Sequence, residues 1–141
     1  MILLDTDHVT LLQWSRNRES AGLRERLAAV ASEVPMTTIV TYEEQTRGWL
    51  AYVKQANDVQ HQVNAYARLS THLENYRVIP VLGFDVLAAG EFRRLRRLPI
   101  RVGTMDLKIA AIALVNDATL LSRNLQDFRK VPGLRVEDWS A

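Results

Sequence analysis

The chain has 141 residues, 48% of them hydrophobic, and its formal net charge is +2. A chain of this length can fold as one domain and bury about two-thirds of its unfolded surface. It contains no cysteine, which excludes disulfides and thiolate metal sites. No apolar run approaches the roughly 20 residues of a membrane span, and no signal-peptide pattern is present. We therefore expect a single domain over residues 1–141, located in the cytoplasm, with no membrane partner.

Short apolar segments alternate with longer helical segments along the chain. Residues 2–4 and 34–38 are expected to be strands, separated by helices at 8–14 and 21–31. Helices at 41–53 and 57–76 precede a strand at 78–81, and Pro80 indicates that this strand lies at a sheet edge or ends there. A helix at 85–98, a helix at 105–115 and strands at 119–122 and 134–136 complete the pattern.

The apolar residues of two of these helices indicate which helix faces are buried against the sheet. The helix at 105–115 is apolar on most sides, which indicates a buried position. In and just before the helix at 85–98, the expected core residues are Phe84, Val86, Leu87, Phe92 and Leu95. Because strands that alternate with helices imply crossover connections, the sequence predicts an α/β fold with a mostly parallel sheet and helices on both faces.

Acidic residues lie at the points where the expected strands end. Asp5 follows the first strand, and Glu43 and Glu44 lie in the helix after the second. Asp106 begins the apolar helix, and Asp127 follows the fourth strand. Crossover connections place all these points at the same edge of the sheet, where ligands bind in such folds.

Carboxylates that converge in this way repel one another, and their pKa values rise unless a cation is bound. Mg²⁺ and Mn²⁺ prefer carboxylate and water oxygens as ligands. Such an ion also lowers the pKa of a bound water and polarises a phosphoryl oxygen. The acids therefore indicate metal-dependent phosphodiester hydrolysis.

Each acid also has a purely structural explanation. Asp5 could be a turn residue, and Asp127 could be an ordinary loop acid. Glu44 comes three residues after Thr41, which is the spacing of a capping box. Asp106 lies in a first helical turn, where a carboxylate complements the helix dipole. The histidines show no metal-ligand spacing, so packing or surface roles are expected for them.

Five stretches, in order, resemble the motifs of PIN-domain proteins and, among these, of VapC-type toxins. They are residues 3–7, 41–48, 103–111, 121–128 and 131–139. The second motif has a Glu followed four residues later by Gly48, which selects Glu44 rather than Glu43. The resemblance extends over essentially the whole chain.

The resemblance implies a PIN-like three-layer α/β/α sandwich and a metal-dependent endoribonuclease, the toxin component of a type II toxin–antitoxin system. Its partners would be an RNA substrate and a cognate antitoxin, and the chain would form a homodimer. The residues that match the catalytic and metal-binding acids, with Mg²⁺ or Mn²⁺ as cofactor, are Asp5, Glu44, Asp106 and Asp127.

Further residues are candidates for supporting roles. Thr104 and Asn124 match positions that often line the site in relatives. Asp7 stands where many relatives carry Asn, which adds a candidate ligand and leaves a second metal ion open. Arg47 and Arg123 flank acidic motifs and are candidates to bind the RNA backbone, with pairing to nearby acids as the equal alternative.

Two other functions are compatible with part of the sequence. A non-catalytic PIN module would bind RNA or a protein without cleavage. A haloacid-dehalogenase-type phosphatase would use Asp5 and Asp7 as its opening motif. That scheme needs a lysine and a further acidic pair after another strand, and too few residues follow Ser122 for this layout.

Overall fold

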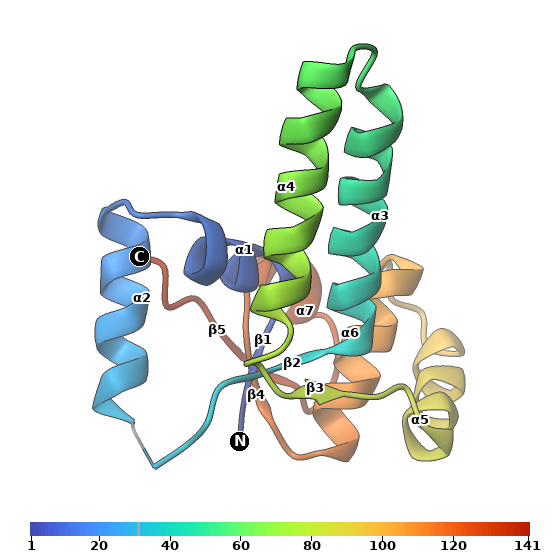
Figure 1. The fold of residues 1–141 in the computed structure, drawn as a ribbon. Coiled ribbons are helices and arrows are strands. Elements are labelled where there is room, and N and C mark those ends of the chain that lie inside the picture. The colour runs from blue at the N-terminus through green and yellow to red at the C-terminus, as the bar shows by residue number, and fades with distance from the viewer. Residues whose placement is uncertain (31) are drawn as a thin grey trace.

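A five-stranded parallel sheet forms the centre of the molecule (Figure 1). The computed structural model describes residues 1–30 and 32–141. The strand order is β3-β2-β1-β4-β5, and all four pairings are parallel. The strands are β1 (Ile2–Leu4), β2 (Met36–Thr38), β3 (Val81–Leu82), β4 (Thr119–Leu121) and β5 (Arg135–Glu137).

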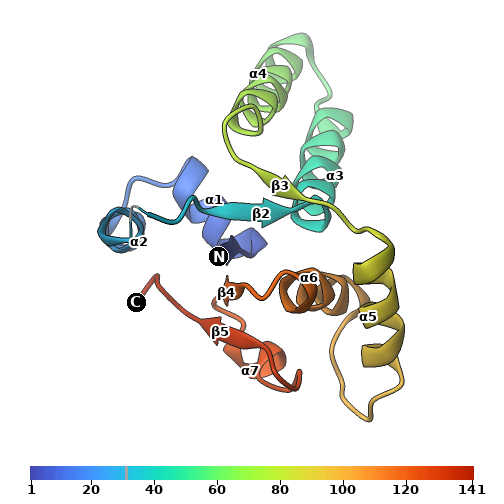
Figure 2. The same ribbon diagram turned by 90° about the horizontal axis from the view of Figure 1, so that it is seen from below.

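Helices cover both faces of this sheet, which gives three layers. They are α1 (Thr6–Trp14), α2 (Arg18–Ala29), α3 (Ile39–Gln55), α4 (Val59–Asn75), α5 (Val86–Arg96), α6 (Thr104–Val115) and α7 (Leu125–Phe128). Figure 2 shows α1 and α2 on one side of the strands and α5 and α6 on the other. The α/β class and the mostly parallel sheet predicted from the sequence are therefore confirmed. No helix in the described ranges is long and apolar enough to cross a membrane.

Alternating side chains of the central strands supply two separate cores, because successive residues of a strand point to opposite faces. Leu3 and Leu120 pack in the larger core, together with α5 and α6. Ile2, Leu4 and Leu121 pack in the smaller core, together with α1 and α2. This burial fixes the register of β1 against β4, since a shift by one residue would exchange the two faces.

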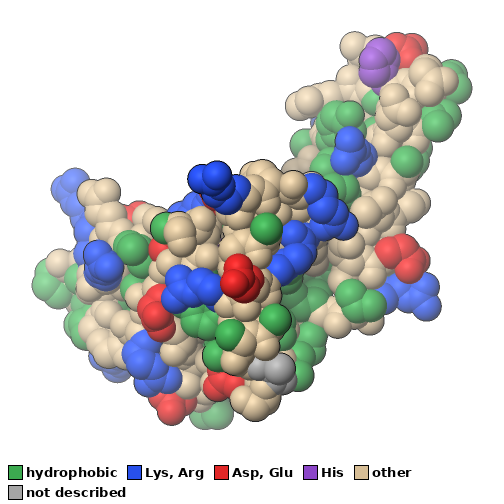
Figure 3. Space-filling view, turned by 90° about the vertical axis from the view of Figure 1, so that its left-hand side faces the viewer, with side chains coloured by type: hydrophobic (Ala, Val, Ile, Leu, Met, Phe, Trp, Pro, Cys, Tyr) green, Lys and Arg blue, Asp and Glu red, His purple; other side chains and the backbone are tan. Residues whose placement is uncertain are grey.

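Helices α3 and α4 form a hairpin that rises beyond the carboxyl edge of the sheet (Figure 1). The Tyr76 hydroxyl donates to Gln45 Oε1 at 2.5 Å, and Thr46 Oγ1 lies 2.8 Å from His72 Nε2. The hairpin also projects from the body in Figure 3, which shows Lys and Arg side chains spread over the face around α2.

Most of the expected elements are found, with altered ends. β2 begins after Pro35 and β3 after Pro80, and β3 lies at an edge of the sheet, as Pro80 indicates. Helix α1 begins at Thr6 because Asp5 caps it. The expected helix at 21–31 corresponds to α2, and residue 31 lies outside the described residues. Helix α7 was not expected; Asn124 caps it by accepting a hydrogen bond from the Asp127 N–H.

The prediction that Val86 and Leu87 are core residues is wrong. Their exposed fractions are 82% and 71%. Helix α5 instead buries Ala88, Phe92 and Leu95 in the larger core. Each helical residue turns the side chain by about 100°, so Val86 and Leu87 lie away from that stripe.

Candidate active site at the carboxyl edge of the sheet

The centre of the site is formed where β1 and β4 end side by side. Leu4 pairs with Leu121, so the residues that follow them, Asp5 and Ser122, are neighbours. The Asp5 N–H donates to the Leu121 carbonyl at 2.9 Å. The Ser122 hydroxyl donates to Asp5 Oδ2 at 2.7 Å, and both residues are buried.

The pKa of Asp5 is raised from 3.8 to about 7, and burial is the largest cause. The nearby charges of Asp7 and Asp106 also raise it, while hydrogen bonds from Ser122 and from the Thr6 N–H lower it. The ionised form is disfavoured because a buried charge loses its hydration. An acid in this state gains from a cation that binds beside it.

Glu44 lies on α3, close enough to the centre to sense its charge. Burial raises the pKa of Glu44, and the charge of Asp106 raises it further, while a hydrogen bond from the Thr6 hydroxyl lowers it. Its Oε1 atom is buried and has no hydrogen-bond partner among the described residues. A buried acceptor without a partner is costly and is therefore available to a ligand.

The structure also separates Glu44 from its neighbour Glu43. Glu43 is exposed and forms an ion pair with Arg47 at 2.7 Å. Thr38, rather than Thr41, caps α3: Thr38 Oγ1 accepts from the Thr41 N–H at 3.0 Å. Thr41 therefore lies inside the helix, and the capping-box explanation for Glu44 does not apply.

Asp106 lies in the first turn of α6 and is linked to α7 through one amide. Asn124 Nδ2 donates to Asp106 Oδ2 at 3.3 Å and to Asp127 Oδ2 at 3.2 Å. Burial raises the pKa of Asp106, the charge of Asp127 raises it further, and the Asn124 hydrogen bond lowers it.

Asp127 lies at the rim of the site, unlike the three inner acids Asp5, Glu44 and Asp106. Hydrogen bonds from Asn124 and Lys130 lower its pKa. Its Oδ1 atom lies 3.2 Å from Lys130 Nζ. The structure thus places Asp127 next to the inner acids but already supplied with a cation of its own.

Asp7 lies on the other side of Ser122. Its Oδ2 atom accepts from the Arg123 N–H at 3.1 Å and lies 3.3 Å from Ser122 Oγ. Its Oδ1 atom lies 2.6 Å from His8 Nδ1. Asp7 is thus held by neighbours on three sides and raises the pKa of Asp5 through its charge.

The remaining candidates lie farther out. Thr104 is exposed at the first position of α6. The Arg47 side chain pairs with Glu43, and the Arg123 side chain pairs with Glu19 and donates to Ser140 Oγ. Both arginines are exposed, and exposed ion pairs contribute little energy.

The acids of the site are of the chemical type that a hard divalent cation prefers. Within residues 1–30 and 32–141, however, no group of three His, Asp or Glu side chains could hold a metal ion in the positions found here. The inner acids Asp5, Glu44 and Asp106 nevertheless supply the carboxylate oxygens that Mg²⁺ and Mn²⁺ prefer. The buried Oε1 atom of Glu44 has no hydrogen-bond partner among these residues and can serve as one such donor.

Two residues of this site were not found from the sequence. Ser122 connects Asp5 and Asp7, and Thr6 contacts both Glu44 and Thr41. The signal for Ser122 was its place directly after an apolar strand, the same place that Asp5 occupies after β1. The pairing of β1 with β4, which places Ser122 beside Asp5, cannot be deduced from that position alone.

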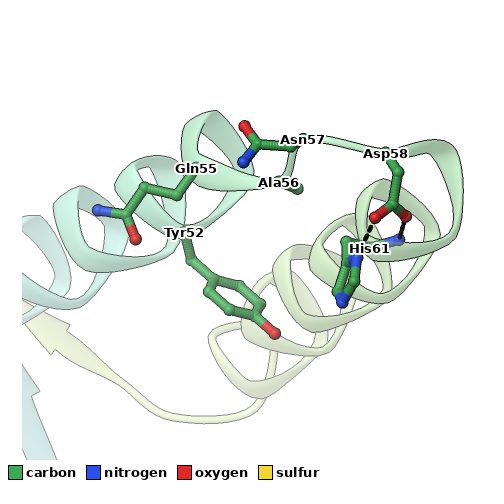
Figure 4. Close-up of a pocket in the computed structure, with 6 residues that line it drawn as sticks. All are labelled: Tyr52, Gln55, Ala56, Asn57, Asp58 and His61. Carbon is green, nitrogen blue, oxygen red and sulfur yellow. Dashed lines mark hydrogen bonds and ion pairs between the residues drawn. The ribbon is translucent and has the colours of Figure 1, made fainter.

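A separate hollow of about 320 Å³ lies at the tip of the α3–α4 hairpin (Figure 4). Its lining residues are Tyr52, Gln55, Ala56, Asn57, Asp58 and His61. Asp58 caps α4 and pairs with His61 at 2.5 Å. The carboxylate there is explained by its helix cap, and the hollow contains none of the acids described above.

The sequence also matches the model of a known protein family. A model of the PIN domain matches residues 2–134, and the chain therefore belongs to the PIN domain family.

Two similar proteins are named as VapC nucleases. Ribonuclease VapC2 of Rickettsia felis is 30% identical over 74 residues, which make up 52% of this chain and 55% of that protein. The tRNA(fMet)-specific endonuclease VapC of Salmonella typhimurium is 37% identical over 65 residues, which make up 43% of this chain and 49% of that protein. The match thus spans about half the length of each relative.

The fold is also similar to a solved structure over its full length. VapBC2 from Rickettsia felis, solved bound to a DNA fragment from their promoter, gives a TM-score of 0.74 at 21% identity. The similarity covers 99% of both chains. The three-layer arrangement is therefore that of a PIN domain.

Proposed function

We propose that this protein is a metal-dependent endoribonuclease that acts as the toxin of a toxin–antitoxin pair, with residues 1–141 forming a single PIN domain. The observation that carries the proposal is the group of three inner acids, which lie directly after β1, on α3 and on α6. Asp5, Glu44 and Asp106 each have a raised pKa, and the charge of Asp106 contributes to the shift of both others.

These three acids would hold one Mg²⁺ or Mn²⁺ ion, with Asp127 and Asp7 as further donors. When bound, the ion supplies a water of lowered pKa and offsets charge on the phosphoryl oxygens. The hydrogen bonds from Ser122 and Asn124 orient the carboxylates, as neighbours of metal ligands commonly do. Burial of Asp5 keeps bulk water from competing for its oxygens.

The relatives support the proposed substrate and partner. Both similar proteins are named as nucleases, and one of these names specifies a transfer RNA. Arg47 and Arg123 would bind the RNA backbone after leaving their acidic partners, Glu43 and Glu19. The similar solved structure is a VapBC complex, which supports a cognate antitoxin for this chain; a homodimer is part of the same proposal.

The test replaces each inner acid by its amide: Asp5→Asn, Glu44→Gln and Asp106→Asn. We expect each variant to fold and to lose Mg²⁺-dependent cleavage of a mixed RNA substrate, measured on denaturing gels. Glu25→Gln is the matched control, because it makes the same chemical change at an exposed site on α2. It should cleave at the wild-type rate.

The same experiments distinguish a nuclease from a PIN module that binds RNA without cleaving it. Full activity in any one inner-acid variant would refute its assigned role. Mg²⁺ binding and RNA binding without cleavage, in a wild-type protein freed from its antitoxin, would instead support a non-catalytic PIN module.

A further inference from the structure

His8 is fully buried directly behind the acidic site, although the sequence assigns it only a packing role. Its exposed fraction is 0%, and both of its ring nitrogens have partners. Nδ1 lies 2.6 Å from Asp7 Oδ1. Nε2 lies 3.1 Å from the backbone nitrogen of Trp139.

The Trp139 contact determines which ring nitrogen carries the proton. A backbone N–H can only donate, so Nε2 of His8 must be the acceptor and cannot itself bear hydrogen. In the neutral ring the proton is then on Nδ1, which donates it to Asp7. The Asp138 carboxylate lies 3.6 Å from Nε2, which is too long for a hydrogen bond.

Asp7 depends on this donor more than on Ser122. The Ser122 hydroxyl has one proton, and the shorter contact, 2.7 Å to Asp5 against 3.3 Å to Asp7, assigns it to Asp5. The remaining donors to Asp7 are His8 Nδ1 and the Arg123 N–H, one to each carboxylate oxygen. The imidazole therefore fixes the orientation of the Asp7 carboxylate.

The other end of the imidazole is fixed by the C-terminal segment. Trp139 is buried in the smaller core with Val9 and Leu23, and the Arg26 guanidinium lies over its ring at 4.6 Å from the centroid. Its backbone N–H is therefore held in place. The segment after β5 thus reaches the acidic site through a single buried side chain.

We propose that His8 is a positioning residue that holds Asp7 beside Asp5 in the orientation required for binding a divalent cation. The proposal rests on the proposed function, since Asp7 matters only if the inner acids hold a metal ion. It also makes the C-terminal segment, through the Trp139 N–H, a part of the site.

Two amide substitutions separate positioning from packing. In His8→Asn the side-chain amide lies near the Nδ1 position and can still donate to Asp7. In His8→Gln the amide reaches the Nε2 position and can meet Trp139, but Asp7 loses its donor. His72→Gln is the control, because His72 is also buried, with an exposed fraction of 2%, and contacts Thr46 in the hairpin.

The first readout is Mn²⁺ affinity by calorimetry, with RNA cleavage measured in parallel. Loss of an outer hydrogen bond to a metal ligand typically costs about 10–100-fold in affinity or activity. We expect His8→Gln to lose that much in Mn²⁺ affinity and in kcat, with KM little changed. We expect His8→Asn to recover most of both, and His72→Gln to lose neither, whatever its melting temperature.

The second readout is the tautomer, from two-bond ¹H–¹⁵N couplings of the His8 ring in labelled wild-type protein. The pattern of a neutral Nδ1–H ring is expected, and an Nε2–H ring would overturn the proposal. Equal losses in the Asn and Gln variants, in proportion to lost stability, would also overturn it.

The same measurements distinguish this proposal from the proposed function. If the wild-type protein binds Mn²⁺ but cleaves no RNA, the nuclease assignment fails, and the affinities of the His8 variants still decide the positioning role. If the wild-type protein binds no Mn²⁺, the positioning role is refuted directly.

Discussion

Replacing Asp5 by Asn should stabilise the metal-free protein at alkaline pH, because it removes a buried charge. The pKa of Asp5 rises from 3.8 to about 7 on folding. Folding thus takes up a proton between these values, and stability falls as pH rises through this window. By this linkage the raised pKa lowers the free energy of unfolding by about 4 kcal/mol at pH 8 and by about 2 kcal/mol at pH 5, relative to a carboxyl group whose pKa stays at 3.8. Relaxation of the site makes these figures upper values.

The amide introduced by Asp5→Asn fits the hydrogen bonds already present. Its oxygen can accept from the Thr6 N–H, as the Asp5 carboxylate does at 2.8 Å. Its NH₂ group can donate to Ser122 Oγ, which then turns its own proton toward Asp7 at 3.3 Å. The second N–H of the amide has no assigned acceptor, so the gain from removing the charge should be smaller than the linkage figures but still present at pH 8.

The assay is urea unfolding of wild type and Asp5→Asn at pH 8 and pH 5, without divalent cation. Asp85→Asn is the matched control, because Asp85 is also the N-cap of a helix but is exposed. It should change stability by less than about 1 kcal/mol at both pH values. A gain for Asp5→Asn that is absent at pH 8, or equal at the two pH values, would refute the reasoning. Added Mg²⁺ should stabilise the wild type more than the variant, because a ligand of the folded state raises its stability.

Three further outcomes are expected. Ser122→Ala removes the hydroxyl that Asp5 accepts at 2.7 Å, and RNA cleavage rates should fall about 10–100-fold, while Ser70→Ala on the exposed hairpin should leave them unchanged. Leu95→Ala, at a fully buried site, should lower the free energy of unfolding by about 2–5 kcal/mol, whereas Leu87→Ala, at a site 71% exposed, should change it by less than about 0.5 kcal/mol. Lys130→Ala should raise the pKa of Asp127, because the Lys130 contact lowers it; carboxyl ¹³C shifts followed by NMR would check this, and an unchanged pKa would contradict the ion pair.

The sheet and the approximate places of the inner acids could be predicted because their signals are local. An apolar strand that ends in Asp5, and an apolar helix that begins near Asp106, are visible within a few residues of sequence. The crossover rule then converts these separate places into one edge. Helix α7 also had a local signal, the Asn124 cap with Asp127 three residues later, which is the ordinary start of a helix.

The residues that were missed depend on contacts between distant parts of the chain. Ser122 matters because it lies beside Asp5, 117 positions away in the sequence. His8 matters because its partner Trp139 is 131 positions away. In α5, the apolar residues surround the helix, so only packing against α6 decides that Ala88 and Phe92 are buried while Leu87 is not.

The Lys and Arg side chains around the site pair with outer acids and leave the inner acids without a positively charged partner. Arg47, Arg123 and Lys130 form ion pairs with Glu43, Glu19 and Asp127, all at the rim or outside it. In the part of the chain that the structure describes, no Lys or Arg forms an ion pair with Asp5, Glu44 or Asp106. The inner acids therefore keep their desolvation cost, which neutral donors such as Ser122 and Asn124 only reduce. The proposed divalent cation would recover this cost, and an arginine placed among these acids would abolish the need for one.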